Sequence, residues 1–321
     1  MIQTENLVSS QVLERFVKLL AAKRLAHAYL FVGPKCIGKE ETALAAARLV
    51  NCENPTPNGF CDACPACVKI KNGTHPDVHM VAQGESSIKI EDIRDLSAQS
   101  QLRSFEAKVK GFIIRDIERL TLEAGNALLK TLEEPTPNTL IILTTSILDS
   151  VLPTIKSRCQ VFYFFPTSSA SLKKRFLTDY HFSEPESHFL AYFSEGCPGR
   201  IPDGDHQAIL KRRNDTIDQF VLSQNEEAYL KIILPDHDKI VEMIHFLFCW
   251  FKDLLLLKMD VPKNRIINID RMSDLEHFKN RYSFEECEGI LNEITKTRKA
   301  LEENFNVKIP LALLKERIWK K

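Results

Sequence analysis

The sequence lacks a net charge of either sign, because 43 basic side chains balance 43 acidic ones. A protein that covers bulk nucleic acid usually carries a positive field, so we expect any DNA contact to be local or supplied by partners. No apolar run of secretory length opens the sequence, and an acid already stands at Glu5. We therefore expect a cytoplasmic protein.

The sequence also lacks an uninterrupted apolar run of the roughly eighteen residues that a membrane helix needs. Its most apolar stretch, MIHFLFCWFKDLLLL at residues 243–257, is interrupted by Lys252 and Asp253. This stretch predicts a buried helix, and we expect no contact with a membrane. Nine cysteines in a chain without an export signal favour free thiols and metal ligation over disulfides.

Apolar runs in the N-terminal half predict an α/β domain with a parallel sheet. The run HAYLFVG at residues 27–33 precedes a loop and then the alanine-rich EETALAAARLV, which is the order strand, loop, helix. The helix-like EAGNALLKTLEE lies between two of three further runs whose β-branched content is typical of buried parallel strands. These runs are GFIIRD at residues 111–116, TLIILTTS at 139–146 and QVFYFF at 160–165.

After Pro166 the pattern becomes helical. Apolar residues recur at intervals of three and four in SSASLKKRFLTDY, DHDKIVEMIHFLFCWFKDLLLLKM and FEECEGILNEITKTRKALEENF. The stretch GCPGRIPDGD at residues 196–205 is dense in turn formers and marks a boundary. We predict an α/β nucleotide-binding-type domain at residues 1–166, a small helical domain at 167–204 and a larger all-helical domain at 205–321.

The stretch GPKCIGKEE, residues 33–41, almost matches a phosphate-binding loop of the form Gly-x-x-x-x-Gly-Lys-[Ser/Thr]. Gly33, Gly38 and Lys39 fit this pattern, but Glu40 replaces the hydroxyl residue that ligates magnesium. A carboxylate at about 4 Å from a phosphate costs about 4 kcal/mol at an effective dielectric near 20. Thr42 cannot substitute, because it points to another side of the helix. We expect the shape of the loop, while ATP binding is doubtful.

The strand that ends at Asp116 lacks the second acid of an active ATPase. Such an enzyme needs an Asp for magnesium and then a Glu that activates the attacking water. Ile117 stands in the second place and can do neither job. Asp116 itself has two interpretations, either a metal-site residue or a cap of the following turn. We predict that the isolated chain lacks ATPase activity.

Four cysteines are the most specific local signal in the sequence. Intervals of eight, two and two residues separate them, inside a segment rich in Pro, Gly and Asn. Paired C-x-x-C turns can direct four thiolates to one tetrahedral centre, so we predict a structural zinc site with no open coordination position. Unliganded thiols and a redox pair are the alternatives. The predicted ligands are Cys52, Cys61, Cys64 and Cys67, in an insert at about residues 52–67.

Two histidines and two lysines near this insert have simpler interpretations. With four cysteines available, His75 and His79 are predicted to be loop and strand residues rather than ligands. A nucleic-acid zinc finger would need many flanking cations, and only Lys69 and Lys71 lie close by. We therefore expect the zinc site to fix a loop.

Arg158, in TIKSRCQ, lies after a short helical turn and just before the last predicted strand. A lone arginine is usually a solvated surface residue. At the edge of a nucleotide-type domain, however, its rigid guanidinium is able to reach the γ-phosphate of a neighbouring subunit. We predict that it acts as an arginine finger in trans.

Together, AHAYLFVGPKCIGKEE, the four cysteines, NALLKTLEEPTPNTLIILTT and LPTIKSRCQ resemble the delta-prime family of bacterial DNA polymerase III clamp-loader subunits, which belong to the AAA+ class. The resemblance runs in continuous order over about residues 27–160. It implies a hetero-pentameric ring with gamma/tau motor subunits and a delta subunit, which opens a sliding clamp and loads it on primed DNA. It further implies that residues 167–204 form a lid and 205–321 a collar, and that this subunit is rigid and does not hydrolyse ATP.

The resemblance leaves some roles open. The sensor threonine is either Thr144 or Thr145, and Thr145 completes the expected vestigial nucleotide site. In GCPGR, Gly199 stands where motor subunits tend to have arginine, and Arg200 follows one place later. The rival hypothesis is an active AAA+ ATPase motor subunit of the same loader, which would need another acid in place of Ile117.

Overall fold

The computed structural model describes residues 9–56, 59–81, 87–201, 204–227, 237–302, 305 and 308–319. The chain divides into two compact units. The N-terminal unit is Met1–Pro166 with Cys197–Arg200, and the C-terminal unit is Thr167–Gly196 with Ile201–Lys321. The predicted boundary between lid and collar lies inside the C-terminal unit and stays a prediction.

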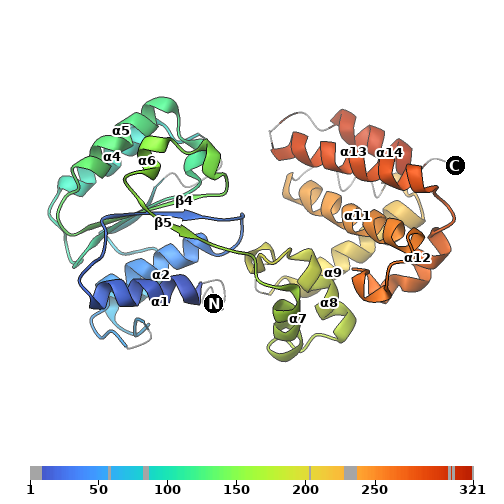
Figure 1. Cartoon of the computed structure of the whole chain (residues 1–321), viewed down its shortest axis with the longest axis horizontal. Coiled ribbons are helices and arrows are strands. Elements are labelled where there is room, and N and C mark those ends of the chain that lie inside the picture. Colours follow the sequence, from blue (N-terminus) through green and yellow to red (C-terminus); the bar gives the residue numbers. More distant parts are fainter. Residues whose placement is uncertain are drawn as a thin grey trace. The chain divides into compact units, whose positions relative to one another are not determined.

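The N-terminal unit contains a parallel five-stranded sheet with the strand order β2-β3-β4-β1-β5 (Figure 1). The predicted α/β fold class is confirmed, and each of the four predicted strands is present. The edge strand β2 was anticipated only through the assignment of His79 to a strand, because its side chains are half-buried and do not form a clear apolar run. The strands are β1 (Ala28–Val32), β2 (Val78–Val81), β3 (Lys110–Ile114), β4 (Thr139–Thr145) and β5 (Gln160–Tyr163).

Helices cover both faces of this sheet (Figure 1). On one face, α1 (Ser10–Ala21) and α2 (Lys39–Asn51) pack against strand residues such as Tyr29 and Phe31. On the other face, α4 (Ile90–Gln101), α5 (Leu122–Glu133) and α6 (Pro153–Lys156) pack against residues such as Leu30. Successive strand residues point to opposite faces, so a strand buried on both sides reads as one apolar run.

Local signals start and shape these helices. The Ser9 hydroxyl accepts a hydrogen bond from the Val12 N–H at 3.4 Å, and Thr121 caps α5 through the Ala124 N–H at 3.2 Å. Both are N-cap residues of the preferred type. The short helix α3 (Pro65–Lys71) follows Cys64, and Ile117–Arg119 form a 3₁₀ turn after β3.

The described part of the C-terminal unit is helical, as predicted. It consists of α7 (Ser169–Thr178), α8 (Glu184–Phe193), α9 (His206–Asp215), a π-helical stretch (Thr216–Leu222), α11 (His237–Lys258), α12 (Met272–Phe278), α13 (Phe284–Glu302) and α14 (Lys308–Ile318), with short 3₁₀ turns between them. The apolar stretch at residues 243–257 lies in α11 as a buried helix. Within the described ranges, no helix is long and apolar enough to span a membrane.

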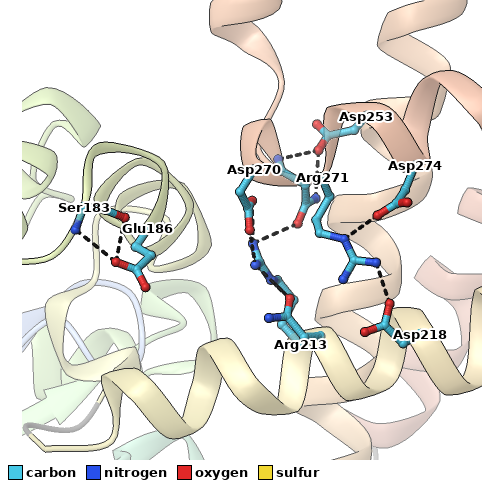
Figure 2. A network of polar contacts seen from close by, with 10 residues as sticks. Ser183, Glu186, Arg213, Asp218, Asp253, Asp270, Arg271 and Asp274 are labelled. Carbon is cyan, nitrogen blue, oxygen red and sulfur yellow. Dashed lines mark hydrogen bonds and ion pairs between the residues drawn. The ribbon is translucent and has the colours of Figure 1, made fainter.

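A buried carboxylate fixes the connection between α11 and α12. Asp253, on α11, is fully buried and accepts hydrogen bonds from the Ile267 N–H at 2.8 Å and the Asn268 N–H at 2.7 Å. The Asn268 side-chain amide donates a third, at 2.8 Å. Figure 2 shows this network beside the pair of Arg213 and Asp270. The loop therefore depends on one buried anion for three of its donors.

We expect Asp253→Asn to destabilise the C-terminal unit by about 2–4 kcal/mol. An amide offers one acceptor oxygen and presents its own N–H groups, so at least one buried donor loses its partner. Both tryptophans, Trp250 and Trp319, lie in this unit, so denaturant unfolding followed by tryptophan fluorescence measures the change. The exposed Asp260→Asn is the matched control, and equal midpoints for both variants would contradict the expectation.

Candidate functional site

The loop after β1 owes its two glycines to the backbone around it. Gly38 has a φ of 93° and starts α2 from the left-handed region, which favours glycine. A Cβ atom on Gly33 would lie 2.7 Å from the carbonyl oxygen of Phe164 and 2.8 Å from its Cβ. Both glycines are therefore required by packing and turn geometry, whether or not a nucleotide is present.

The side chain of Lys39 is bound to its own loop. Its ammonium donates to the carbonyl oxygens of Gly33 at 2.6 Å and Pro34 at 2.7 Å. Burial lowers the pKa of Lys39, and the nearby charges of Asp116, Glu118 and Glu40 oppose this effect. Lys39 thus already faces two carbonyls and the charges of three carboxylates, where a phosphate would add further negative charge.

The side chains of Glu40 and Thr42, close to Lys39 in the sequence, also have partners within the protein. The Glu40 carboxylate pairs with Arg115 at 2.7 Å. Burial raises the pKa of Glu40, and the charge of Arg115 opposes this. The Thr42 hydroxyl donates to the Gly38 carbonyl at 2.6 Å and accepts from the Ser9 N–H at 2.9 Å. Arg115 could not be predicted as the partner of Glu40, because their contact joins two elements that are distant in sequence.

Asp116 and the two candidate sensor threonines lie at the carboxyl ends of β3 and β4. Asp116 has a φ of 47° and is the N-cap residue of the 3₁₀ turn, where its carbonyl accepts from the Arg119 N–H at 2.9 Å but its side chain makes no capping hydrogen bond. Its carboxylate lies 3.9 Å from a guanidinium nitrogen of Arg119. The Thr144 hydroxyl accepts from the Asp116 N–H at 3.1 Å, whereas the Thr145 hydroxyl accepts from the Ile147 N–H at 3.0 Å.

Glu118 is a site residue that sequence reasoning missed. One of its carboxylate oxygens accepts from the Ser146 N–H at 3.1 Å and from the Ser146 hydroxyl at 2.6 Å. Burial raises the pKa of Glu118, but the bonds from Ser146 and Thr145 outweigh it and hold the pKa below its usual value. The only available signal was its position two residues after Asp116, which a 3₁₀ turn brings back toward the strand ends.

The segment Cys197–Arg200 belongs to the N-terminal unit although it is distant in sequence. The Gly199 N–H donates to the carbonyl oxygen of Cys36, within the loop, at 3.0 Å. The charge of Arg200 also acts on the Cys36 thiol and lowers its pKa, against a larger rise caused by burial. Residues 199 and 200 therefore lie beside the loop, and the backbone of Gly199 is hydrogen-bonded to that of Cys36.

Arg158 is held at the opposite end of the strands from the loop. It follows α6 and precedes β5, so it lies at the amino ends of the strands, while the loop lies at the carboxyl ends. Its guanidinium pairs with Glu133 of α5 at 2.6 Å and donates to the Thr154 carbonyl at 2.9 Å. With 34% of its side chain exposed, Arg158 is reachable from outside the unit.

The four cysteines come together as predicted. One sulfur from each of Cys52, Cys61, Cys64 and Cys67 lies within 4.8 Å of the others. A tetrahedral zinc site with Zn–S bonds of about 2.3 Å separates its sulfurs by about 3.8 Å, so small side-chain adjustments bring these four into place. The donor set therefore fits a structural metal ion such as zinc.

Backbone groups support the cysteine cluster. The Cys61 N–H donates to the Cys52 sulfur and the Cys64 N–H to the Cys61 sulfur, both at 3.3 Å. N–H groups of Ala63 and Cys64 lower the pKa of the Cys61 thiol to about 6, whereas burial raises the pKa of Cys52 and Cys67. A bound cation would deprotonate these thiols as well.

The two histidines near the cluster lie in the turn and the strand expected for them. His79 is in β2 and stacks on Phe112, with ring centroids 5.3 Å apart. His75 is buried in the preceding turn, where its Nδ1 accepts from the Asp77 N–H at 3.2 Å. Neither belongs to the cluster of four sulfurs.

Comparison with known proteins gives matches over both units. The family model described as "DNA polymerase III, delta subunit" matches residues 8–168, and the one described as "DNA polymerase III, delta subunit, C terminal" matches residues 207–317. The chain is 28% identical to the DNA polymerase III subunit delta' of Bacillus subtilis over 94% of this chain and 93% of that protein. It is 32% identical to the subunit delta' of Pseudomonas aeruginosa over 72% of this chain and 71% of that protein.

A further relative is similar over a shorter part. The chain is 37% identical to the DNA polymerase III subunit tau of Bacillus subtilis, over 49% of this chain and 28% of that protein. Similarity to the delta' proteins extends over most of both chains, and similarity to tau over about half of this one.

We expect Gly33→Ala to destabilise the N-terminal unit by about 1–3 kcal/mol, the usual cost of an added methyl group in a packed site. The new Cβ would meet backbone atoms of Phe164, which cannot rotate away. Gly111→Ala is the control, since its Cβ would meet no backbone atom and only side-chain atoms of Val78 and Ala47, 3.3 Å away or more. Thermal unfolding followed by circular dichroism measures both, and an unchanged Gly33→Ala transition would show that packing does not require this glycine.

Proposed function

The chain belongs to the delta' subunit family of the DNA polymerase III clamp loader, and we propose that it works there without hydrolysing ATP itself. In this proposal it assembles with gamma/tau motor subunits and a delta subunit in a hetero-pentameric ring in the cytoplasm. It supplies Arg158 in trans to ATP held by a neighbouring subunit, and the ring loads a sliding clamp on primed DNA.

The observation that carries this proposal is the self-contained loop. The ammonium of Lys39 is bound to the Gly33 and Pro34 carbonyls, and Glu40 is paired with Arg115. ATP would have to displace these contacts without gaining the magnesium hydroxyl that Glu40 replaces. In this proposal the nucleotide site is vestigial: it keeps the conformation of a phosphate-binding loop but no longer binds or hydrolyses ATP. Its residues are Gly33, Gly38, Lys39, Asp116 and Thr145.

The position of Arg158 supports action on another subunit. Strand β1 has five residues and rises about 3.3 Å per residue, so the amino and carboxyl ends of the strands lie about 16 Å apart. Arg158 lies at the amino ends and the loop of the same chain at the carboxyl ends, so this guanidinium cannot reach a phosphate in its own loop. A phosphate presented by a neighbour is the alternative that fits its exposure.

The rival hypothesis, an active motor subunit, has one residue in its favour. Glu118 directly follows Ile117 in the chain, and the charge of Glu118 acts on Lys39. One of its carboxylate oxygens is already bound to the backbone and hydroxyl of Ser146, and the other is buried without a hydrogen-bond partner in the described part of the chain. Despite burial, the bonds from Ser146 hold the pKa of Glu118 below its usual value, which makes Glu118 a weak base for a water molecule.

The C-terminal unit contains two apolar clusters that support the lid and collar division. One joins α7 and α8 through residues such as Leu172 and Phe189 and extends to α9 and α11 through Ile209 and Phe246. The other joins α11, α13 and α14 through residues such as Trp250, Ile290 and Leu314. We propose that the first cluster packs a lid at residues 167–204 against α9 and α11, and that the second is the core of a collar at 205–321.

We further propose that the metal of the cysteine cluster is zinc and that its role is structural. Four protein sulfurs leave no open position for catalysis. A nucleic-acid role gains no support, because Lys69 is paired with Glu106 at 2.7 Å rather than directed to solvent alone.

We expect about one zinc per chain, and release of that zinc in Cys64→Ser. A thiolate is a far stronger zinc ligand than a hydroxyl, so three sulfurs should hold the ion weakly. Elemental analysis of protein purified without chelator measures the stoichiometry, and circular dichroism checks that the strands stay folded. Cys249→Ser, a buried cysteine outside the cluster, is the control and should keep its zinc. Wild-type protein without zinc would end this proposal.

We expect Arg158→Ala to leave ring assembly intact while lowering the ATPase activity of the assembled loader in the presence of clamp and primed DNA. An arginine finger contributes about a thousandfold or more in rate, but only at the one site that Arg158 serves. The loss in total ATPase should therefore be partial and the loss in clamp loading deeper. Arg158→Lys should rescue only in part, because an ammonium cannot make a planar two-pronged contact.

Lys156→Ala removes a cation from the end of α6, two residues before Arg158, and is the matched control. The isolated chain should show no ATP turnover, and steady turnover that disappears in Lys39→Ala would support the motor hypothesis instead. A loader with Arg158→Ala that hydrolyses ATP and loads clamps at the unmutated rate would remove the role in trans.

A further inference from the structure

Residues 102–109, which join α4 to β3, keep two large apolar side chains in water. Leu102 is 66% exposed and Phe105 is 84% exposed. Exposure of such side chains costs free energy, and an unrestrained loop would reduce that cost by folding them onto the nearby surface. Contacts elsewhere in the loop must therefore hold it in this conformation.

Two buried charges hold the loop at both ends. The carboxylate of Asp77 accepts from the N–H groups of Phe105 at 2.9 Å and of Glu106 and Ala107 at 2.8 Å. At the other end, the buried ammonium of Lys110 donates to backbone carbonyls at the end of α4, those of Gln99, Ser100 and Leu102. The backbone on either side of Leu102 and Phe105 is thus fixed by charge-assisted hydrogen bonds.

The loop is also bonded to the segment that carries the four cysteines, Cys52–Lys71, which we call the cysteine module. The ammonium of Lys108 donates to the carbonyl oxygen of Cys52 at 2.5 Å. Immediately before the module, the buried side chain of Asn51 donates to the Val109 carbonyl at 2.9 Å and accepts from the Val109 N–H at 3.0 Å. A cysteine that belongs to the cluster is therefore a direct anchor of the loop.

A second link comes from α3, the short helix that contains Cys67. Its Lys69 pairs with Glu106 at 2.7 Å, next to Phe105. Both side chains are partly exposed, so the pair is worth little by itself. Its position matters more, because Lys69 follows Cys67 by two residues and moves with it.

We propose that the metal-loaded cysteine module is a brace that holds residues 102–109, and with them Leu102 and Phe105, in one conformation. This inference rests on the metal binding proposed above but concerns a segment about 40 residues away along the chain. The brace acts through the Cys52 carbonyl and through α3, whose positions depend on a common centre for the four sulfurs.

The effect of metal removal should be local and partial. Asp77 and Lys110 belong to the sheet and the turn before it, so their bonds to the loop remain. The contacts of Lys108 and Lys69 should loosen, because α3 is the only helix in the described residues of the module and Cys52 is held on one side alone, by the end of α2. Opening of the loop should then become easier while the strands stay closed.

Hydrogen exchange on the full chain, read by mass spectrometry, tests the brace. We compare zinc-loaded protein with protein treated with a chelator, and elemental analysis of the same samples gives the zinc content. Chelation should speed exchange of the Phe105, Glu106 and Ala107 amides roughly five- to tenfold, the effect of about one lost hydrogen bond. Amides of α11, in the other unit, should not change.

Two variants test the contacts without removing the metal. Lys108→Met keeps the aliphatic stem and loses the ammonium, so it should speed exchange in the loop while the zinc content stays at one per chain. Lys69→Glu should do so more weakly, and adding Glu106→Lys should restore the pair and the slow exchange. Lys130→Met, on the exposed face of α5, is the matched control.

Chelation that speeds exchange in residues 61–67 but leaves 105–107 unchanged would overturn the brace and leave the metal site standing. A chain that carries no metal would contradict the metal site and the brace together, and the elemental analysis separates this result from the first. Faster exchange in both segments, with the pattern of variants given above, supports the proposal.

Discussion

The position of β1 in the sheet is the constraint on which the rest of the N-terminal unit depends. This strand pairs with β4 on one side and β5 on the other, and the chain leaving it passes directly against Phe164. The Gly33 N–H continues the ladder to the Thr145 carbonyl at 3.2 Å. Only a residue without a side chain fits this passage, so the sheet itself dictates the first turn of the loop. A phosphate-binding shape is thus retained by packing alone, which is why the shape is no evidence of nucleotide binding.

Charges left at such a site must find partners within the protein. Removing a lysine or a carboxylate from water is costly unless hydrogen bonds or an opposite charge replace the water. Lys39 finds two carbonyls, Glu40 finds Arg115 and Glu118 finds Ser146. Each of these pairings satisfies a group that a bound nucleotide or metal ion would otherwise face. The same residues that suggest a nucleotide site in the sequence are therefore paired with groups of the folded chain itself.

Sequence could predict the parts of this protein that depend on local pattern. The buried strands at Ala28–Val32 and Thr139–Thr145 are continuous apolar runs, and the cysteine spacing defines its cluster without reference to the fold. Strand β2 could not be found from an apolar run, because the residues of this edge strand are only half-buried. The ion pairs of Arg158 with Glu133 and of Glu40 with Arg115 could not be predicted for another reason. Each forms only after elements that are distant in sequence have packed together. Periodicity finds elements, whereas partners of charged residues follow from tertiary structure.

The pair between Arg158 and Glu133 determines how readily this arginine could serve another subunit. A partly exposed ion pair of this kind is worth about 0–1 kcal/mol, so releasing the guanidinium costs little. Stabilisation of a phosphoryl transition state by an arginine, a factor of about 10³–10⁵ in rate, corresponds to about 4–7 kcal/mol. The second quantity exceeds the first several-fold, so the pair with Glu133 would not prevent this arginine from acting in the proposed role. In the isolated chain, Glu133 and the Thr154 carbonyl keep the guanidinium partly exposed at the amino ends of the strands. An arginine buried as deeply as Lys39 would have to break the fold around it to act in the same way.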